Sequence, residues 1–508
     1  MRLLAGLDVG TGGVRAVVVD ESGRVRAAAT ASYPLHQPRP GWTEQDPEDW
    51  WRGTEVALGR ALEAAGGGEV VGLGLAGQMH GAVFLDAADR VLRPALLWND
   101  QRTSAQCRRI TELVGERRLL EVAGNPALTG FQAPKILWLR DEEPERFRRL
   151  ARVLLPKDYV RLRLTGELAT DASDASGTLL LDLRRRDWAR PILEALEIPV
   201  DWLPPVREAP EPAGGVRAVV ASSLGLRPGV PVAAGAGDNA AAAVGTGVVE
   251  PGRLSCSIGT SGVLFAPTAG LTPDPSGRVH AFCHAVPGAY HLMGVTLSAG
   301  GSLRWWRDLL RGAGGAGDYD RLTAAAAEVP VGADGLLFLP YLDGERTPHL
   351  DPLARGQFFG LTSRHTHAHL TRAVMEGALF ALRDALQAMR SLGLEPAEVR
   401  ATGGGSRHPL WLRLEADVLG LPVLRPLVDE GAAYGAALLA GVAAGVYRDL
   451  GEACSLVALR PEVVEPDPAR VAAYERLHGL YRELYPATAG LAHRLASPIA
   501  GEGPAPPA

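Results

Sequence analysis

The sequence predicts an α/β protein made of two similar domains. The chain has 508 residues, about three times the length of a typical domain. Short apolar runs, such as residues 70–75 and 230–236, are typical of buried strands and alternate with segments rich in Ala and Leu that are typical of helices. A glycine-turned pattern near the N-terminus also recurs in the second half of the chain. Together these observations favour a duplicated α/β architecture.

The first element that we expect is a hairpin closed by glycines. Residues 3–9 form an apolar run, residues 10–13 read Gly-Thr-Gly-Gly, and residues 14–19 form a second run rich in Val. Dinucleotide-binding and P-loop sites place their glycines between a strand and a helix, whereas a strand follows here. The sequence also has no Gly-x-x-x-x-Gly-Lys motif. The pattern therefore argues against an NAD-dependent dehydrogenase and a P-loop protein.

The second copy of this pattern is Gly259-Thr260-Ser261-Gly262-Val263, which again lies between two strand-like runs. The copies start nearly half a chain length apart, which predicts two similar domains at residues 1–245 and 246–490. Residues 491–508 are rich in Pro, Gly and Ala, so we expect a disordered tail there. A chance match is the alternative for so short a pattern.

Two helices can be predicted from spacing and composition. Leu379, Leu382 and Leu386 recur at intervals of three and four within residues 369–390, which predicts a helix facing the core. Residues 430–437 are mostly Gly and Ala, so we expect a helix that packs closely at a domain interface.

The composition excludes several functional classes. The net charge is −6 and there is no basic run, so nucleic acid is not an expected partner. The longest apolar stretches are too short or too rich in Ala and Gly to span a bilayer, so no membrane association is expected. The four cysteines are far apart and form no Cys-x-x-Cys motif, which favours a reducing cytoplasm over a zinc site or a disulfide framework. The oligomeric state stays open, with a homodimer as one option.

Both glycine turns are candidate phosphate-binding sites. Successive backbone N–H groups bind phosphate oxygens well, and glycine lets a ligand approach the backbone closely. The candidate residues are Thr11 and Gly12 in the first turn and Gly259, Thr260 and Ser261 in the second. Asp8, at the end of the first strand, is placed to hold Mg²⁺ directly or through water. For one turn alone an ordinary hairpin is the simpler interpretation, but for two duplicated turns phosphate binding is favoured.

A candidate catalytic base follows the strand-like run 230–236. Asp238 and Asn239 stand directly after Gly237, where a strand would present a carboxylate at its carboxyl end. A positioned carboxylate can accept a hydroxyl proton as the oxygen attacks a γ-phosphorus. The alternative is that Asp238 caps the Ala-rich helix that begins near Asn239. The two roles are compatible.

Two further motifs carry polar groups between glycines. Gln78, Met79 and His80 lie between Gly77 and Gly81, after the strand-like run 70–75, and an amide and an imidazole suit sugar hydroxyls. A structural histidine is the alternative.

The second of these motifs is a run of three glycines followed by a serine. Its residues are Gly403, Gly404, Gly405 and Ser406. A bare backbone there would let a flat base such as adenine lie close, and a flexible strand-to-helix turn is the alternative.

The order of these motifs resembles that of the FGGY carbohydrate kinases over nearly the whole chain. Three longer segments strengthen the resemblance, namely residues 42–47 (Trp-Thr-Glu-Gln-Asp-Pro), 155–159 (Leu-Pro-Lys-Asp-Tyr) and 341–348 (Tyr-Leu-Asp-Gly-Glu-Arg-Thr-Pro). Several long motifs in register are far more specific than one glycine loop.

The resemblance implies two ribonuclease-H-like domains of the actin and hexokinase type, with ATP and sugar in a cleft between them. It implies that Asp238 is the catalytic base, that Asn239 lies in the sugar pocket, and that Met79 and His80 contact the substrate. It assigns residues 403–406 to nucleotide binding and makes Asp8 and Asp238 the metal contacts. Domain closure on sugar binding is a further expectation.

The expected reaction is phosphorylation of D-xylulose by ATP with Mg²⁺, with Asp238 as general base. Kinases of another ketopentose or polyol, such as ribulose, gluconate or glycerol, are the nearest alternatives. Glycerol is disfavoured because glycerol kinases carry charged residues at the position of Gln78 to His80. An actin-like ATPase that phosphorylates no sugar is the alternative from another class.

Overall fold

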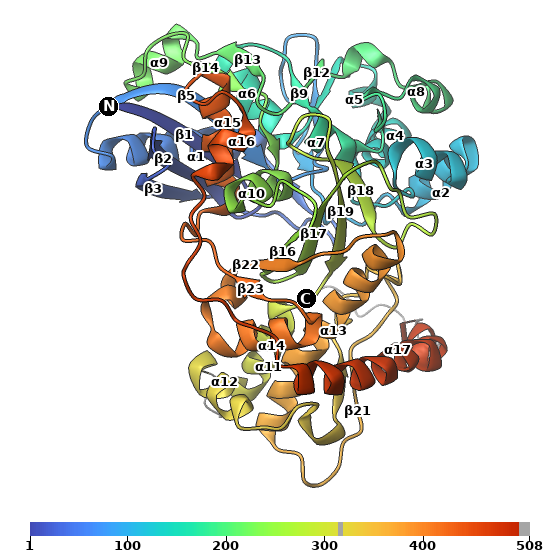
Figure 1. The fold of residues 1–508 in the computed structure, drawn as a ribbon. Helices are drawn as coiled ribbons and strands as arrows, with labels where there is room; N and C mark the ends of the chain where they lie inside the picture. Colours follow the sequence, from blue (N-terminus) through green and yellow to red (C-terminus); the bar gives the residue numbers. More distant parts are fainter. Residues whose placement is uncertain (313–317, 497–508) are drawn as a thin grey trace. The chain divides into compact units, whose positions relative to one another are not determined.

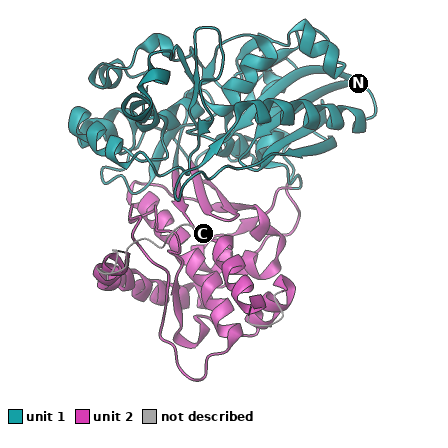
Figure 2. Cartoon of the chain, turned by 180° about the vertical axis from the view of Figure 1, so that it is seen from behind, with its two compact units in different colours: residues 1–251, 267–292, 427–458 teal, residues 252–266, 293–426, 459–508 magenta. Residues whose placement is uncertain are grey.

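The computed structural model describes residues 1–312 and 318–496, which form two compact units (Figures 1 and 2). The first unit comprises Met1–Pro251, Pro267–Leu292 and Leu427–Ala458, and the second comprises Gly252–Ala266, Met293–Pro426 and the described residues from Leu459 onward. Neither unit is a contiguous half of the chain, because two later segments return to the first unit.

The first unit is built around a seven-stranded sheet. Its strands are β1 (Arg2–Val9), β2 (Gly13–Asp20), β3 (Val25–Ser32), β5 (Glu69–Gly77), β13 (Pro212–Gly215), β14 (Pro231–Ala233) and β15 (Ala236–Gly237). Their order is β13-β14-β5-β1-β2-β3, with β15 paired to β5. β1 and β2 form the predicted hairpin, antiparallel from Leu3 opposite Asp20 to Val9 opposite Val14. β5 lies parallel to β1, β14 and β15.

The second main sheet has six strands in the order β18-β19-β17-β16-β22-β23. They are β16 (Arg253–Ile258), β17 (Gly262–Thr268), β18 (His280–Cys283), β19 (Tyr290–Thr296), β22 (Glu398–Thr402) and β23 (Val423–Leu424). The second predicted hairpin, β16 and β17, is antiparallel, and β22 pairs in parallel with β16 on one side and β23 on the other. The run β3-β2-β1-β5-β14 thus corresponds to β19-β17-β16-β22-β23. The two glycine hairpins belong to sheets of the same strand order, as the duplicated sequence pattern predicts.

The two faces of β1 carry different side chains because residues alternate across a strand. Leu3, Ala5 and Leu7 join the hydrophobic core that includes residues of α1 (Pro47–Ala64). Gly6 faces α15 (Gly431–Ala443) so closely that a Cβ there would lie 1.9 Å from the Ala433 carbonyl oxygen. Only glycine allows this helix to lie against the strand.

α15 packs in the same way on helix α10 (Asp238–Thr246). A Cβ on Gly435 would lie 1.8 Å from the carbonyl oxygen of Ala241. The predicted close packing of residues 430–437 is therefore confirmed, but its place is corrected. Both helices belong to the first unit, so the contact is internal to that unit and does not form a domain interface.

The remaining α-helices are divided between the two units. In the first unit they are α2 (Ser104–Val114), α3 (Glu116–Ala123), α4 (Gln132–Glu142), α5 (Pro144–Phe147), α6 (Pro156–Thr165), α7 (Ala172–Ala175), α8 (Arg190–Leu196), α9 (Ala218–Leu224) and α16 (Leu450–Ser455). In the second unit they are α11 (Gly300–Gly312), α12 (Tyr319–Ala327), α13 (His367–Ser391), α14 (Pro409–Leu419) and α17 (Pro468–Ala496). The helix predicted over residues 369–390 is α13, and Leu379, Leu382 and Leu386 are each fully buried.

The C-terminal prediction needs one correction. Residues 491–496 continue helix α17, where a disordered tail was expected, while residues 497–508 lie outside the described residues. Residues 491–496 read Leu-Ala-His-Arg-Leu-Ala, which mostly have good helix propensity, so the helix extends through them. None of the helices in the described ranges combines the length and the apolar character needed to cross a membrane.

We expect Gly435→Ala to destabilise the protein by about 3 kcal/mol, because the added methyl group must displace the Ala241 carbonyl or push the two helices apart. Thermal or urea unfolding measures this change. The matched control is Gly479→Ala in α17, where a Cβ would have no atom within 4 Å. That substitution should be neutral or stabilise by up to about 1 kcal/mol through helix propensity. Wild-type stability of Gly435→Ala would contradict the packing described above.

Candidate active site

The ends of neighbouring strands bring the predicted catalytic residues together in the first unit. β1 and β15 both lie parallel to β5, and the register places Asp8 and Gly237 opposite the last two residues of β5. Asp238 follows Gly237, so Asp8 and Asp238 flank the carboxyl end of β5. The loop of residues 78–80 continues from that same end. The sheet register thus gathers two carboxylates and the candidate sugar-binding loop.

The two carboxylates sit in an environment that disfavours their ionised forms. Burial, together with the charge of Asp238, raises the pKa of Asp8 to about 7. Burial also raises the pKa of Asp238 to about 6, although hydrogen bonds from Asn239 work against this shift. One Asp8 oxygen, Oδ1, is buried and accepts no hydrogen bond from any described residue. A pair of this kind can accept a proton near neutral pH and can hold a cation.

Asp238 is the first residue of α10 and is not its cap. Gly237 occupies the N-cap position, and the Asp238 carboxylate accepts hydrogen bonds from the backbone N–H of Asn239 at 2.7 Å and from its side-chain Nδ2 at 2.9 Å. The capping interpretation is therefore wrong, because Asp238 lies inside the first turn of the helix and its carboxylate bonds to its neighbour Asn239. Asn239 fixes the orientation of the candidate base.

Met79 and His80 follow the end of β5 that the carboxylate pair flanks. Met79 is buried and packs so tightly on Gly237 that a Cβ there would lie 2.9 Å from the Met79 Cγ. His80 has a φ of 69° and donates from Nδ1 to the carbonyl oxygen of Gly177 at 2.6 Å. Its ring meets Phe131 edge-on, with the ring centroids 4.9 Å apart. In the neutral ring Nε2 is then the acceptor, which suits a sugar hydroxyl.

Gln78 has a different position from its two neighbours. Its amide oxygen accepts a hydrogen bond from the Thr11 hydroxyl at 3.0 Å, and its Nε2 donates to Gln45 at 3.0 Å. Trp98 Nε1 donates to the same Thr11 hydroxyl at 3.0 Å. The hydroxyl proton of Thr11 is thus directed to Gln78, and the donors that the first hairpin turn offers a phosphate are its backbone N–H groups. Gln78 acts on the site by holding this turn.

A buried charge network lies behind the Asp238 loop and was missed from the sequence. Lys157 is fully buried and pairs with Asp158 at 2.7 Å, Asp171 at 2.9 Å and Asp174 at 3.1 Å. Burial alone would lower the pKa of Lys157, but the three carboxylates raise it. Ser173, which donates to Asp171, accepts the backbone N–H of Gly237 at 3.2 Å. The network therefore supports the residue directly before Asp238. The only sequence feature that pointed to this network was the segment 155–159, which contains Lys157 and Asp158 and was noted for the family resemblance.

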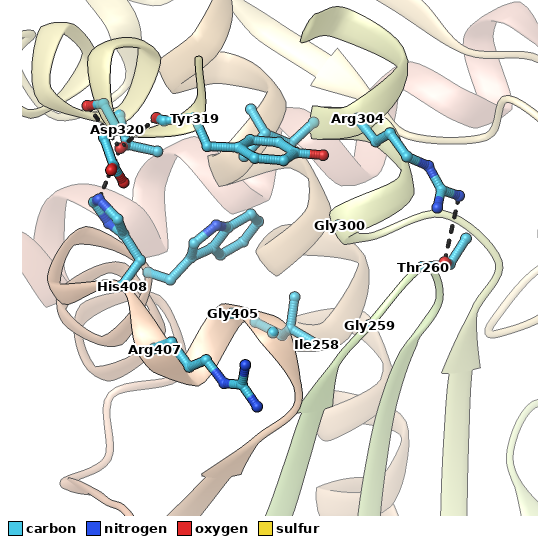
Figure 3. A pocket seen from close by; sticks show the side chains of 14 residues that line it. Ile258, Gly259, Thr260, Gly300, Arg304, Tyr319, Asp320, Gly405, Arg407 and His408 are labelled. Carbon is cyan, nitrogen blue, oxygen red and sulfur yellow. Dashed lines mark hydrogen bonds between the residues drawn. The ribbon is translucent and has the colours of Figure 1, made fainter. Parts of the chain in front are cut away.

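The second unit contains a cavity of about 410 Å³, large enough for a small organic ligand. Its walls come from the second hairpin turn, the starts of α11, α12 and α14, and the glycine run after β22 (Figure 3). The lining residues are Ile258, Gly259, Thr260, Gly300, Leu303, Arg304, Tyr319, Asp320, Thr323, Gly404, Gly405, Arg407, His408 and Trp411. Two motifs predicted to bind a nucleotide thus line one cavity, although Thr260 and Gly404 are 404 − 260 = 144 positions apart in sequence.

Four of the predicted nucleotide-binding residues line this cavity, namely Gly259, Thr260, Gly404 and Gly405, whereas Ser261, Gly403 and Ser406 do not. Gly403 has a φ of 76°, and a Cβ there would lie 2.7 Å from the Ile258 carbonyl oxygen, so glycine is required by the backbone. The Ser406 hydroxyl donates to the Gly403 carbonyl oxygen at 2.8 Å. These two residues shape the turn that carries Gly404 and Gly405.

The helix-borne part of the cavity was also missed from the sequence. Arg304, Tyr319, Asp320, Thr323 and His408 come from helix starts that carry no glycine motif. His408 Nε2 lies 2.7 Å from the Thr323 hydroxyl, which joins the start of α14 to the second turn of α12. Spacing alone gives no signal for residues that only the packing of three helices brings together.

The segment 341–348 supports the second hairpin turn. Glu345 is buried, and its carboxylate accepts hydrogen bonds from the Thr296 hydroxyl at 2.6 Å and from the Leu297 N–H at 3.1 Å. Burial raises the pKa of Glu345 to about 8. The chain then runs to Ala299, whose N–H donates to the Thr260 carbonyl oxygen at 2.9 Å. Glu345 thus fixes residues 296–299, the segment between β19 and α11 that is hydrogen-bonded to Thr260.

The comparisons with known proteins agree with this geometry. The chain is 44% identical to a xylulose kinase of Escherichia coli over 94% of this chain and 98% of that relative. Among solved structures, a xyloylose kinase from Brucella ovis shares 42% identity and a TM-score of 0.90, covering 96% of this chain and 100% of that chain. A gluconate kinase from Lactobacillus acidophilus shares 27% identity and a TM-score of 0.92, covering 97% of this chain and 100% of that chain.

The family match covers both halves of the chain. The N-terminal domain of the FGGY family of carbohydrate kinases matches residues 3–245, and the C-terminal domain of that family matches residues 254–444. The first match includes the two carboxylates at the end of β5, and the second includes the cavity next to the second hairpin. This chain belongs to the FGGY family of carbohydrate kinases.

Proposed function

We propose that this chain transfers the γ-phosphoryl group of ATP to the terminal hydroxyl of D-xylulose, with D-xylulose 5-phosphate and ADP as products. Membership of the family makes it an ATP-dependent sugar kinase. The observation that carries the choice of sugar is the near full-length similarity to xylulose kinases, at 44% identity to that of Escherichia coli. Likeness of fold alone does not select the sugar, because a gluconate kinase has the same fold.

Asp238 is the proposed general base. Its carboxylate accepts the proton of the C5 hydroxyl as that oxygen attacks the γ-phosphorus, and the bond from phosphorus to the bridging oxygen of ADP breaks. A pKa near 6 leaves most of the carboxylate ionised at neutral pH while keeping it basic enough to take a proton. The hydrogen bonds from Asn239 hold this group in one orientation.

The residues that we propose to contact the sugar are Met79, His80, Asp238 and Asn239. Met79 supplies an apolar wall beside Gly237, and His80 supplies an acceptor for a hydroxyl group. Gln78 contributes indirectly, because its amide is bonded to Thr11 and Gln45.

Asp8 and Asp238 fit a Mg²⁺ ion. Oxygen ligands suit this ion, and the buried Asp8 Oδ1 accepts no hydrogen bond from a described residue. No group of three or more His, Cys, Asp or Glu ligands occurs among the described residues. Mg²⁺ commonly takes only one or two carboxylates and completes its shell with water and substrate phosphates. When bound, the ion would neutralise charge on the phosphate groups.

The cavity of the second unit is the proposed ATP site. Gly404 and Gly405 leave the backbone bare beside the aromatic side chains of Tyr319 and Trp411, which suits a flat base. Gly259 and Thr260 offer backbone N–H groups and a hydroxyl for phosphates. A reducing, cytoplasmic location is part of the proposal and is supported by the free state of Cys107, Cys256, Cys283 and Cys454.

The first test is a coupled ADP-release assay with Mg²⁺-ATP across D-xylulose, D-ribulose, L-ribulose, D-gluconate and glycerol. We expect the highest kcat/KM on D-xylulose and a loss of at least about 1,000-fold in kcat for Asp238→Asn, because the amide cannot accept the proton. The exposed Asp201→Asn is the matched control and should retain wild-type activity. Preference for another sugar would leave the role of Asp238 as general base standing and would contradict D-xylulose as the substrate. Sugar-independent ATP hydrolysis unaffected by Asp238→Asn would overturn the kinase mechanism.

The raised pKa values also predict a pH dependence. Activity requires ionised Asp238, so kcat/KM should rise with pH, with a midpoint between about 6 and about 7 for the interacting pair. Asp8→Asn should lower this midpoint to about 6 as well as lower the rate, since it removes the group with the higher pKa, about 7, and leaves only the titration of Asp238. Titration of ATP itself would give a midpoint that does not move in Asp8→Asn, and that result would contradict the assignment to Asp238.

A further inference from the structure

The cavity of the second unit has two chemically different ends. Arg304 and Thr260 lie together at one end, while Asp320 and His408 lie at the other (Figure 3). Tyr319 extends over the cavity, and the guanidinium of Arg307 lies 4.4 Å from its ring centroid. One face of the Tyr319 ring is thus covered by a cation of the protein, and the ring also lines the cavity. The aromatic groups suit a base, so the phosphates of a nucleotide belong at the Arg304 end.

Arg304 projects from the second turn of α11 toward the tip of the second hairpin. Its Nη2 donates to the Thr260 hydroxyl at 3.3 Å. Its guanidinium forms no ion pair with a carboxylate anywhere in the part of the chain that the structure describes. Most arginines on this protein are paired, for example Arg307 with Asp308 at 2.6 Å. An arginine without a counter-ion beside a bare glycine turn is a ready site for an anion.

The chain places one other cation, Arg407, and no lysine in the lining of this cavity. Its only lysines are Lys135 and Lys157, which are both fully buried in the first unit. Charge on a polyphosphate in this cavity must therefore be met by arginine, by backbone N–H groups or by a metal ion. Gly300, at the start of α11, lines the same end, and a Cβ there would lie 2.4 Å from the Gly259 carbonyl oxygen. The start of the helix is thus pressed against the hairpin turn, next to Arg304.

We propose that Arg304 is the phosphate-binding cation of the nucleotide site. Its guanidinium binds non-bridging oxygens of the nucleotide polyphosphate, while Tyr319 and Trp411 cover the base. The proposal rests on the proposed function, because it takes the cavity as the ATP site. It adds a residue that recognises the phosphates and not the base.

Calorimetric titration with ADP and with adenosine separates these two contributions, because adenosine has the base and no phosphate. We expect Arg304→Ala to weaken ADP binding by about 10- to 100-fold and to change adenosine binding by less than about twofold. Arg304→Lys should recover part of the loss. Arg311→Ala, on the same helix and outside the cavity, is the matched control for net charge and should bind both ligands as the wild type does.

Tyr319→Ala is the second variant, and it should weaken ADP and adenosine alike. If it does so while Arg304→Ala leaves ADP binding unchanged, or weakens both ligands equally, the role of Arg304 is overturned and the cavity remains the nucleotide site. If neither variant changes binding of either ligand, the nucleotide binds elsewhere, and both the proposed ATP site and the role of Arg304 are overturned. Both side chains are exposed, so the fold should tolerate the substitutions.

Discussion

The pairing of β1 and β15 with the two edges of β5 is the constraint on which the rest of the candidate active site depends. Because parallel strands end at the same edge of a sheet, this pairing puts Asp8 and Asp238 on either side of one strand end. A shift of one residue in either register would turn a carboxylate to the other face of the sheet. Gly6 and Gly435 let α15 pack closely on β1 and on α10, and this packing stabilises the register.

The same pairing accounts for the electrostatics of the site. Burial at this strand end raises the pKa values of both carboxylates toward neutrality, and the charge of Asp238 raises that of Asp8 further. The surrounding structure compensates for the free-energy cost of burying these carboxylates, because many other contacts fix the segments that carry them. Lys157 and its three aspartates fix the loop before Asp238, and Gln78 fixes the turn after Asp8. The reactive groups are thereby set on rigid supports.

The second unit contains the second hairpin turn and a cavity beside it. Its hairpin turn, which corresponds to the turn after Asp8, presents Gly259 and Thr260 to a cavity. The supporting side chain here is Glu345, which accepts hydrogen bonds from Thr296 and Leu297 in the segment that joins β19 to α11. The two sheets therefore differ in what lies at their ends, with a carboxylate pair at the end of one sheet and a cavity of about 410 Å³ beside the other.

The sequence by itself determined the elements whose signals are local. Glycine turns between β-branched runs predicted both hairpins, regular apolar spacing predicted α13, and a carboxylate after a buried strand pointed to Asp238. Only the tertiary structure decided the direction of each side chain. It directed the Thr11 hydroxyl to Gln78, turned Asp238 away from a capping role, and brought Arg304 and Tyr319 to the cavity. Local patterns determine backbone preference. Hydrogen-bond partners and cavity walls come from segments far apart in sequence, and contacts between such segments produce no regular spacing in the sequence.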